Sequence, residues 1–287
     1  MTGVGSSKAP IGVFDSGLGG LTVLRALHER LPGEDLIYFG DTARVPYGTK
    51  GEKTVRAFAR QDAGLLVARG VKMVVVACNT ASAFALDYLR AELPVPVLGV
   101  INPGVRTALS ATRGGSVGVI GTSGTIRSLR YQEGLVAGGL TESQIVAREC
   151  PLFVPLVEEG MGDHAMTDLA IEEYLAPLRE AEVDTLILGC THYPLLKAEI
   201  SAYMGDDVRL VDSADVLAAA AHERLAELDL LRPEATAGRE GELSFLLSDI
   251  PWKFQEIGAR FLGQPIVNMK TVGLDEMEAA GHAIEQS

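Results

Sequence analysis

The stretch VKMVVVACNT, residues 71–80, aligns without a gap with VDTLILGCTH, residues 183–192. Each begins as a short apolar run, as a buried strand does, and continues into a cysteine followed by polar residues. A second pair, IGVFDSG from Ile11 and VGVIGTSG from Val117, aligns more loosely. The two cysteines are separated by nearly the same number of residues as the corresponding glycines of the second pair. This near-equal spacing indicates two related halves, each with one cysteine at the corresponding position.

Strand-like runs, polar turns and helical periodicity alternate along the chain and predict βα units with parallel sheets. The clearest predicted strands are Pro10–Phe14, Val71–Ala77, Ser116–Ile120 and Val183–Leu188, and the clearest helices are Leu21–Leu31 and Ser82–Glu92.

The fold class that follows is α/β, with two pseudo-symmetric parallel-sheet domains. We expect residues 1–100 and 208–287 to form the first domain, which carries Cys78. Residues 101–207 are expected to form a second domain, inserted within the first, which carries Cys190. Because open α/β sheets bind ligands at the carboxyl ends of their strands, we expect the active site in the cleft between the domains.

Composition excludes several classes of protein. The 287 residues include 25 basic and 38 acidic side chains, a net charge of −13, which is the wrong sign for a nucleic-acid partner. No apolar run is long enough to span a membrane, and the first ten residues lack the apolar core of a signal peptide, so a cytoplasmic protein is expected. No set of His, Cys, Asp and Glu residues has metal-ligand spacing, so neither a metal nor a cofactor is expected.

Three cysteines, Cys78, Cys150 and Cys190, form no CxxC pair and are expected to be free thiols. Removing an α-hydrogen and returning it to the opposite face requires a base and an acid on two sides of one carbon. Cys78 and Cys190, coming from two facing halves, meet this requirement without a cofactor. Each follows a strand and precedes a helix, whose N-terminus lowers a thiol pKa. The alternative is that each is a small buried residue, which is the role we assign to Cys150.

Polar neighbours of the two cysteines are candidates for assisting roles. His192 could hold the thiol of Cys190 as a thiolate or relay its proton, or it could be a surface or substrate-binding histidine. Asp15 could assist Cys78, or cap the helix that follows it. The GTSGT stretch at residues 121–125 offers hydroxyls and backbone N–H groups to a carboxylate, with Thr122 as the side-chain ligand.

Five blocks in order, FDSGLGGLTVLR, GDTARVPYG, ACNTAS, CPLFVPLVEEG and GCTHYPLL, together resemble bacterial glutamate racemase. The resemblance runs from Ile11 to Gly263. It implies two α/β domains, no cofactor, interconversion of L-glutamate and D-glutamate, and supply of D-glutamate for peptidoglycan. It also implies a homodimer, since members of this family are often homodimers.

Site residues follow from the same resemblance. Cys78 corresponds to the thiol that takes the α-proton from D-glutamate, and Cys190 to the thiol that serves L-glutamate. Asp41 and Glu158 match acidic residues implicated in catalysis, although a slip of one residue would exchange Glu158 with Glu159. The substrate-contacting pairs correspond to Asp15 with Ser16, Tyr47 with Gly48, Asn79 with Thr80, and Thr191 with His192.

Two other functions stay open from the sequence. A racemase of the same two-thiol superfamily that acts on aspartate or a hydantoin would share the paired cysteines. A noncatalytic amino-acid-binding or redox-sensing protein could instead use two nearby thiols as a switch. Substrate competition separates the first from a glutamate enzyme, and isotope exchange separates the second.

Overall fold

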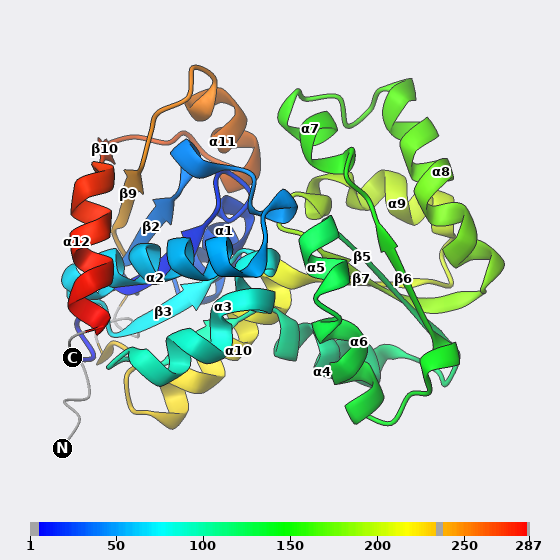
Figure 1. Ribbon diagram of the computed structural model, residues 1–287, viewed down its shortest axis with the longest axis horizontal. Helices are drawn as coiled ribbons and strands as arrows, with labels where there is room; N and C mark the ends of the chain where they lie inside the picture. Colours follow the sequence, from blue (N-terminus) through cyan, green and yellow to red (C-terminus); the bar gives the residue numbers. More distant parts are fainter. Residues whose placement is uncertain (1–5, 234–237, 286–287) are drawn as a thin grey trace.

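The computed structural model describes residues 6–233 and 238–285. The chain forms two lobes side by side, each built on a parallel sheet with flanking helices (Figure 1). We call them the larger lobe and the smaller lobe. The larger lobe has a six-stranded sheet in the order β10-β9-β2-β1-β3-β4. Its strands are β1 (Ile11–Asp15), β2 (Leu36–Gly40), β3 (Met73–Val76), β4 (Val97–Gly99), β9 (Leu243–Leu247) and β10 (Met269–Thr271).

The smaller lobe has a four-stranded sheet in the order β6-β5-β7-β8. Its strands are β5 (Ser116–Gly121), β6 (Ile145–Glu149), β7 (Val183–Gly189) and β8 (Arg209–Asp212). Neighbouring strands of both sheets are parallel. The α/β fold class predicted from the sequence is therefore confirmed.

The two sheets repeat one arrangement of four strands. The order β2-β1-β3-β4 of the larger sheet matches the order β6-β5-β7-β8 of the smaller one. The registers match as well, because Gly12 pairs with Val74 in one sheet and Gly118 with Leu186 in the other. The pseudo-symmetry indicated by the repeated sequence blocks is thus present in the strand order, and β9 and β10 extend only the larger sheet.

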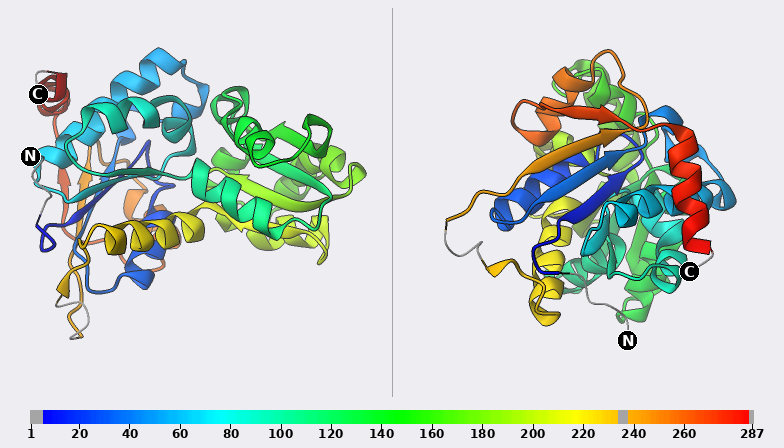
Figure 2. Two further views of the ribbon diagram at one scale, coloured as in Figure 1. Left: turned by 90° about the horizontal axis from the view of Figure 1, so that it is seen from below. Right: turned by 90° about the vertical axis from the view of Figure 1, so that its left-hand side faces the viewer.

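Helices cover both faces of the sheets (Figures 1 and 2). Around the larger sheet lie α1 (Leu21–Arg30), α2 (Glu52–Ala68), α3 (Asn79–Glu92), α10 (Ser213–Glu227), α11 (Phe254–Leu262) and α12 (Leu274–Glu285). Around the smaller sheet lie α4 (Ile101–Ala111), α5 (Ser123–Arg127), α6 (Arg130–Ala137), α7 (Phe153–Glu158), α8 (Ala165–Glu180) and α9 (Lys197–Met204). Short 3-10 turns are η1 (Thr42–Arg44), η2 (Tyr47–Thr49), η3 (Glu142–Gln144) and η4 (Tyr193–Leu196). No helix among the described residues is long and apolar enough to cross a membrane.

The crossings between the lobes lie at two points of the chain. The chain leaves the larger sheet after Gly99 and enters the smaller lobe at α4. It returns after Asp212, because β8 pairs with β7 through Asp212. From the sequence we expected the inserted domain to end at residue 207, and we now propose Asp212 as its last residue.

The candidate site lies at the carboxyl ends of the central strands, where polar residues follow. All residues of β1 and β3 are buried, as expected for strands covered by helices on both faces. The helix after β3 begins at Asn79, three residues before the predicted start at Ser82. The reason is that Cys78 serves as its N-cap, with the sulfur accepting from the backbone N–H of Ala81 at 3.5 Å.

Candidate active site

Cys78 and Cys190 open into one small cavity of about 30 Å³ between the lobes. Cys78 follows β3 of the larger lobe and Cys190 follows β7 of the smaller one. The cavity therefore brings together two strand ends that are far apart in the sequence. Of the residues singled out in the sequence, those that line it are Ser16, Tyr47, Gly48, Cys78, Asn79, Thr80, Thr122, Cys190, Thr191 and His192. Val45, Pro46 and Val154 also line it and were not predicted.

The thiol of Cys78 lies near a neutral hydroxyl group and an acidic side chain. Its sulfur lies 3.7 Å from the hydroxyl of Ser16. Burial and, to a lesser extent, the charge of Asp15 raise the pKa of Cys78 to about 12 against the backbone N–H of Ala81, which lowers it. The N–H at the start of α3 lowers this pKa, as expected from the sequence, but burial and the Asp15 charge outweigh it. Cys78 is therefore a protonated thiol at neutral pH.

The thiol of Cys190 has a basic neighbour. Its sulfur lies 3.9 Å from Nδ1 of His192, whose Nε2 lies 2.9 Å from Oε1 of Glu158. Burial lowers the pKa of His192, but hydrogen bonds to Cys190 and Glu158 outweigh it and raise the pKa to about 10. The imidazole is consequently protonated at neutral pH. A positive charge therefore lies beside the Cys190 sulfur.

The two adjacent glutamates have different partners. Glu158, at the end of α7, contacts His192, whereas Glu159 lies on the surface, with its carboxylate 3.3 Å from the Lys253 ammonium. Glu158 is therefore the acid that reaches the site. His192 also packs edge-on against the ring of Phe261 from α11, with the ring centroids 5.2 Å apart.

Asp15 is buried beneath the loop that follows β1. Its Oδ2 accepts from the backbone N–H of Gly17 at 3.0 Å, and its Oδ1 has no hydrogen-bond partner within the described part of the chain. Burial raises its pKa against the opposing charge of His192. Asp15 is absent from the cavity wall, so it acts on Cys78 through its charge. A Cβ at Gly20 would lie 2.4 Å from the Cβ of Asp15, so the loop needs a glycine there.

Asp41 lies behind Tyr47 rather than beside a cysteine. It is fully buried and accepts from Nε of Arg44 at 2.7 Å, from the hydroxyl of Tyr47, and from the hydroxyl of Ser248 at 2.9 Å. The Tyr47 oxygen also lies 2.8 Å from Oδ2 of Asp62, so its single proton is shared between the two carboxyl groups. Asp41 therefore supports the Tyr47–Gly48 segment, and its influence on the site passes through Tyr47.

Asp62 and Arg44 also contribute to the hydrogen bonds that hold Tyr47 and Asp41. Neither was predicted from the sequence. Asp62 lies on the buried face of α2, where Ala59, Ala63 and Leu66 are also buried. Its Oδ1 pairs with the Arg44 guanidinium at 3.0 Å. An acidic residue at a core position of an amphipathic helix is the sequence signal that could have found Asp62.

A cluster of threonine hydroxyls joins the lobes at the opposite wall of the cavity. Thr80 Oγ1 lies 2.9 Å from Thr122 Oγ1, and Thr122 caps α5 by accepting from the N–H of Thr125. The loop carrying Gly48 approaches so closely that a Cβ there would lie 2.7 Å from the Cβ of Thr122. Hydroxyls at a helix N-terminus can hold an anionic group such as a carboxylate.

Cys150 lies outside the cavity. It is completely buried, and burial raises its pKa, so its thiol stays protonated. The backbone carbonyl of Cys150 accepts from the Tyr193 hydroxyl at 3.0 Å. These contacts fit the structural role expected from the sequence.

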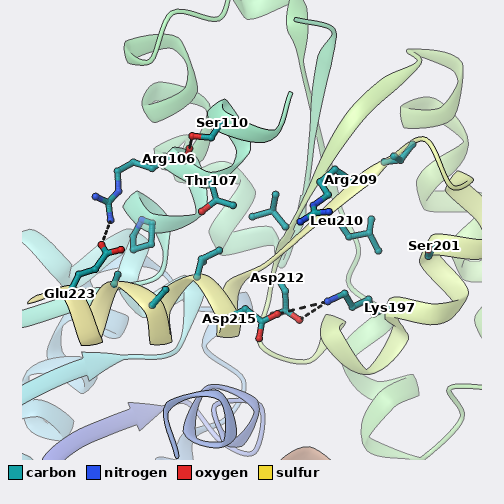
Figure 3. Close-up of a pocket in the computed structure, with 16 residues that line it drawn as sticks. Arg106, Thr107, Ser110, Lys197, Ser201, Arg209, Leu210, Asp212, Asp215 and Glu223 are labelled. Carbon is teal, nitrogen blue, oxygen red and sulfur yellow. Dashed lines mark hydrogen bonds and ion pairs between the residues drawn. The ribbon is translucent and has the colours of Figure 1, made fainter. Parts of the chain in front are cut away.

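A larger open groove of about 870 Å³ lies elsewhere, between α4, α10 and β8 (Figure 3). Its charged side chains are of both signs: Lys197 lies 3.6 Å from Asp212, and Arg106 lies 4.0 Å from Glu223. Neither a cysteine nor a histidine lines this groove. The groove therefore lacks the paired thiols that line the small cavity.

Among residues 6–233 and 238–285, no group of three or more His, Cys, Asp or Glu side chains could hold a metal ion. The chemistry that the cavity itself offers is proton transfer. A protonated thiol from one lobe and a cysteine beside an imidazolium from the other face the same small space.

Comparisons with known proteins point to one family. The model of the Asp/Glu/hydantoin racemase family matches residues 11–221. A glutamate racemase of Geobacter metallireducens is 51% identical over 92% of this chain and 97% of its own length. The crystal structure of glutamate racemase from Thermus thermophilus in complex with beta-chloro-D-alanine is 44% identical, with a TM-score of 0.84, over 94% of this chain and 99% of that one. Glutamate racemase from Francisella tularensis in complex with D-glutamate is 38% identical, with a TM-score of 0.86 and the same coverage.

Proposed function

This chain belongs to the Asp/Glu/hydantoin racemase family, and from that premise we propose that it interconverts L-glutamate and D-glutamate by proton transfer between two cysteines. The observation that carries the proposal is the placement of Cys78 and Cys190, from different lobes, in one cavity with unlike surroundings. The D-glutamate formed would supply peptidoglycan synthesis, as the family resemblance implies. Glutamate is favoured over aspartate or a hydantoin because the curated relatives at 42–51% identity over most of the chain are glutamate racemases.

The proton balance of the reaction follows from the two sulfurs. The Cys190 thiolate removes the α-proton of L-glutamate, and the Cys78 thiol donates its proton to the opposite face. D-glutamate then leaves a protonated Cys190 and a Cys78 thiolate, which is the arrangement that serves the reverse reaction. Positioned acid and base groups of this kind typically contribute about 10²–10⁴-fold in rate.

The surrounding residues have distinct roles in this proposal. The charge of His192, supported by Glu158, holds the Cys190 thiolate, and Asp15 keeps Cys78 protonated. Thr80, Thr122 and the segment Tyr47–Gly48 would bind the substrate, together with Ser16, Asn79 and Thr191. Asp41 is a positioning residue for Tyr47 rather than a group that touches substrate.

The cavity must widen to admit an amino acid. Its free volume of about 30 Å³ leaves room for little more than water. We infer that the lobes separate to let substrate in and approach again around it, which excludes water from the reacting carbon. The homodimer and the cytoplasmic location expected from the sequence stay predictions, and sedimentation of the purified protein tests the first.

Deuterium exchange tests the function directly. The purified, cofactor-stripped protein is incubated with L-glutamate in deuterated water, and optical rotation and α-deuterium are followed by NMR. Loss of rotation together with α-deuterium incorporation is the expected result. Exchange with aspartate or a hydantoin but not with glutamate would keep the mechanism and discard the substrate. Exchange with none of them, together with binding that changes on thiol oxidation, would favour the noncatalytic redox switch.

A further inference from the structure

Asn79 and Tyr131 meet across the two lobes. Tyr131 lies on α6 of the smaller lobe, has no exposed surface, and donates from its hydroxyl to Asn79 Oδ1 at 2.8 Å. Asn79 is the first residue of α3 in the larger lobe, follows Cys78 directly and lines the cavity. Tyr131 of the smaller lobe is thus hydrogen-bonded to Asn79, a residue of the larger lobe that lines the cavity.

The ring of Tyr131 packs against two glycines, where a larger residue would crowd it. A Cβ at Gly104, on α4, would lie 3.2 Å from Cε1 of the Tyr131 ring, and a Cβ at Gly189 would lie 3.4 Å from Cε2. Gly189 is the residue before Cys190, so the ring passes close to the second catalytic strand end. Burial raises the pKa of Tyr131, and the charge of Cys190 raises it further. The hydroxyl therefore stays protonated and remains a donor.

The bond to Tyr131 decides which way the Asn79 amide points. Because the hydroxyl donates, Oδ1 must face it, and the opposite orientation would remove the acceptor from a buried O–H. Nδ2 then points away from Tyr131, and within the described residues it is buried without a hydrogen-bond partner. A buried N–H₂ group without a partner is costly, so an acceptor is expected when the site is occupied.

We propose that Tyr131 is a positioning residue that turns the Asn79 amide so that its N–H₂ group donates to a carboxylate oxygen of the bound amino acid. The proposal rests on the proposed function, because the carboxylate belongs to the glutamate substrate. Since the bond crosses between the lobes, Asn79 is oriented only when both lobes are together. Tyr131 itself contacts neither the substrate nor the reacting atoms.

Steady-state kinetics of Tyr131→Phe test the proposal, with glutamate racemisation as the assay. The substitution removes the hydroxyl and keeps the ring, so KM should rise about tenfold while kcat changes less than about twofold. Tyr193→Phe is the matched control, because Tyr193 is also fully buried and donates to a backbone carbonyl within its own lobe. Both variants should lose similar thermal stability, and only Tyr131→Phe should raise KM.

Substitutions at Asn79 show whether Tyr131 acts through it. Asn79→Ala should raise KM by at least as much as Tyr131→Phe, and the double variant should match Asn79→Ala alone. An unchanged KM in Tyr131→Phe, or fold-changes that multiply in the double variant, would overturn the proposal. If Tyr131→Phe does not fold, an unchanged KM in Asn79→Ala overturns it equally. A wild-type protein inactive on glutamate overturns the proposed function and this inference together, whereas an active wild type confines any failure to Tyr131.

Discussion

The surroundings of Cys78 and Cys190 differ although both sulfurs follow corresponding strands of matching sheets. Beside Cys78 lie the Ser16 hydroxyl, which lowers the thiol pKa, and the charge of Asp15, which together with burial raises it. Beside Cys190 lies His192, which is protonated because of its bonds to Cys190 and Glu158. The symmetry of the backbone therefore does not extend to the charges.

This difference teaches that one duplicated scaffold can hold an acid and a base at once. In the proposed mechanism, L-glutamate requires a thiol at Cys78 and a thiolate at Cys190. Because the two products of racemisation are mirror images, the equilibrium constant is one, and kcat/KM must be equal in both directions. A change at either cysteine must therefore lower kcat/KM for both enantiomers together.

The largest expected effect comes from removing either sulfur. Cys78→Ser and Cys190→Ser should each lower kcat/KM in both directions by about 10³-fold, because a hydroxyl is far too weak an acid to ionise near neutral pH. Circular dichroism should show an unchanged fold, and Cys150→Ser should affect stability alone. Near-normal turnover in either of the first two variants, or loss of activity only in Cys150→Ser, would refute the assignment.

A smaller effect should follow from removing the charge beside one sulfur. His192→Asn should lower kcat/KM by about 100-fold, since the Cys190 thiolate loses its cation, whereas Asp15→Asn should cost about tenfold. Comparing kcat/KM for L-glutamate between the two variants tests this difference between the two sides. Equal losses in the two variants would mean that the asymmetry of charge does not matter to the reaction.

The smallest expected effect is a shift in pH dependence. The pKa of His192 is raised from 6.5 to about 10, so its charge is present at neutral pH and is lost as pH rises through about 10. Glu158→Gln removes one cause of that rise, so the alkaline limb of kcat/KM should move to lower pH, with a loss of less than about tenfold at neutral pH.

Glu159→Gln is the matched control for this shift. Glu159 pairs with Lys253 on the surface, where an ion pair contributes little to stability. The pH profile of the Glu159→Gln variant should therefore follow that of the wild type. An alkaline limb that moves in Glu159→Gln and not in Glu158→Gln would show that the other glutamate supports His192.

The local sequence predicted the strands that carry the site better than the side-chain contacts within it. The strands before both cysteines and the repeat between the halves were visible as apolar runs with the same spacing. The start of α3 was placed three residues late, because the capping role of Cys78 is not readable from periodicity. The positions of Asp41 behind Tyr47 and of Tyr131 beneath Asn79 could not be predicted, since each depends on segments that are distant in the chain.

By itself, the sequence determined two parallel sheets and a cysteine at the end of one strand in each. It could do so because hydrophobic periodicity and strand-end polar residues are local properties. Only the tertiary structure decided how the surroundings of the two cysteines differ. A pKa depends on burial and on charges from other segments, and Glu158 reaches His192 from 34 residues away while Ser16 reaches Cys78 from 62.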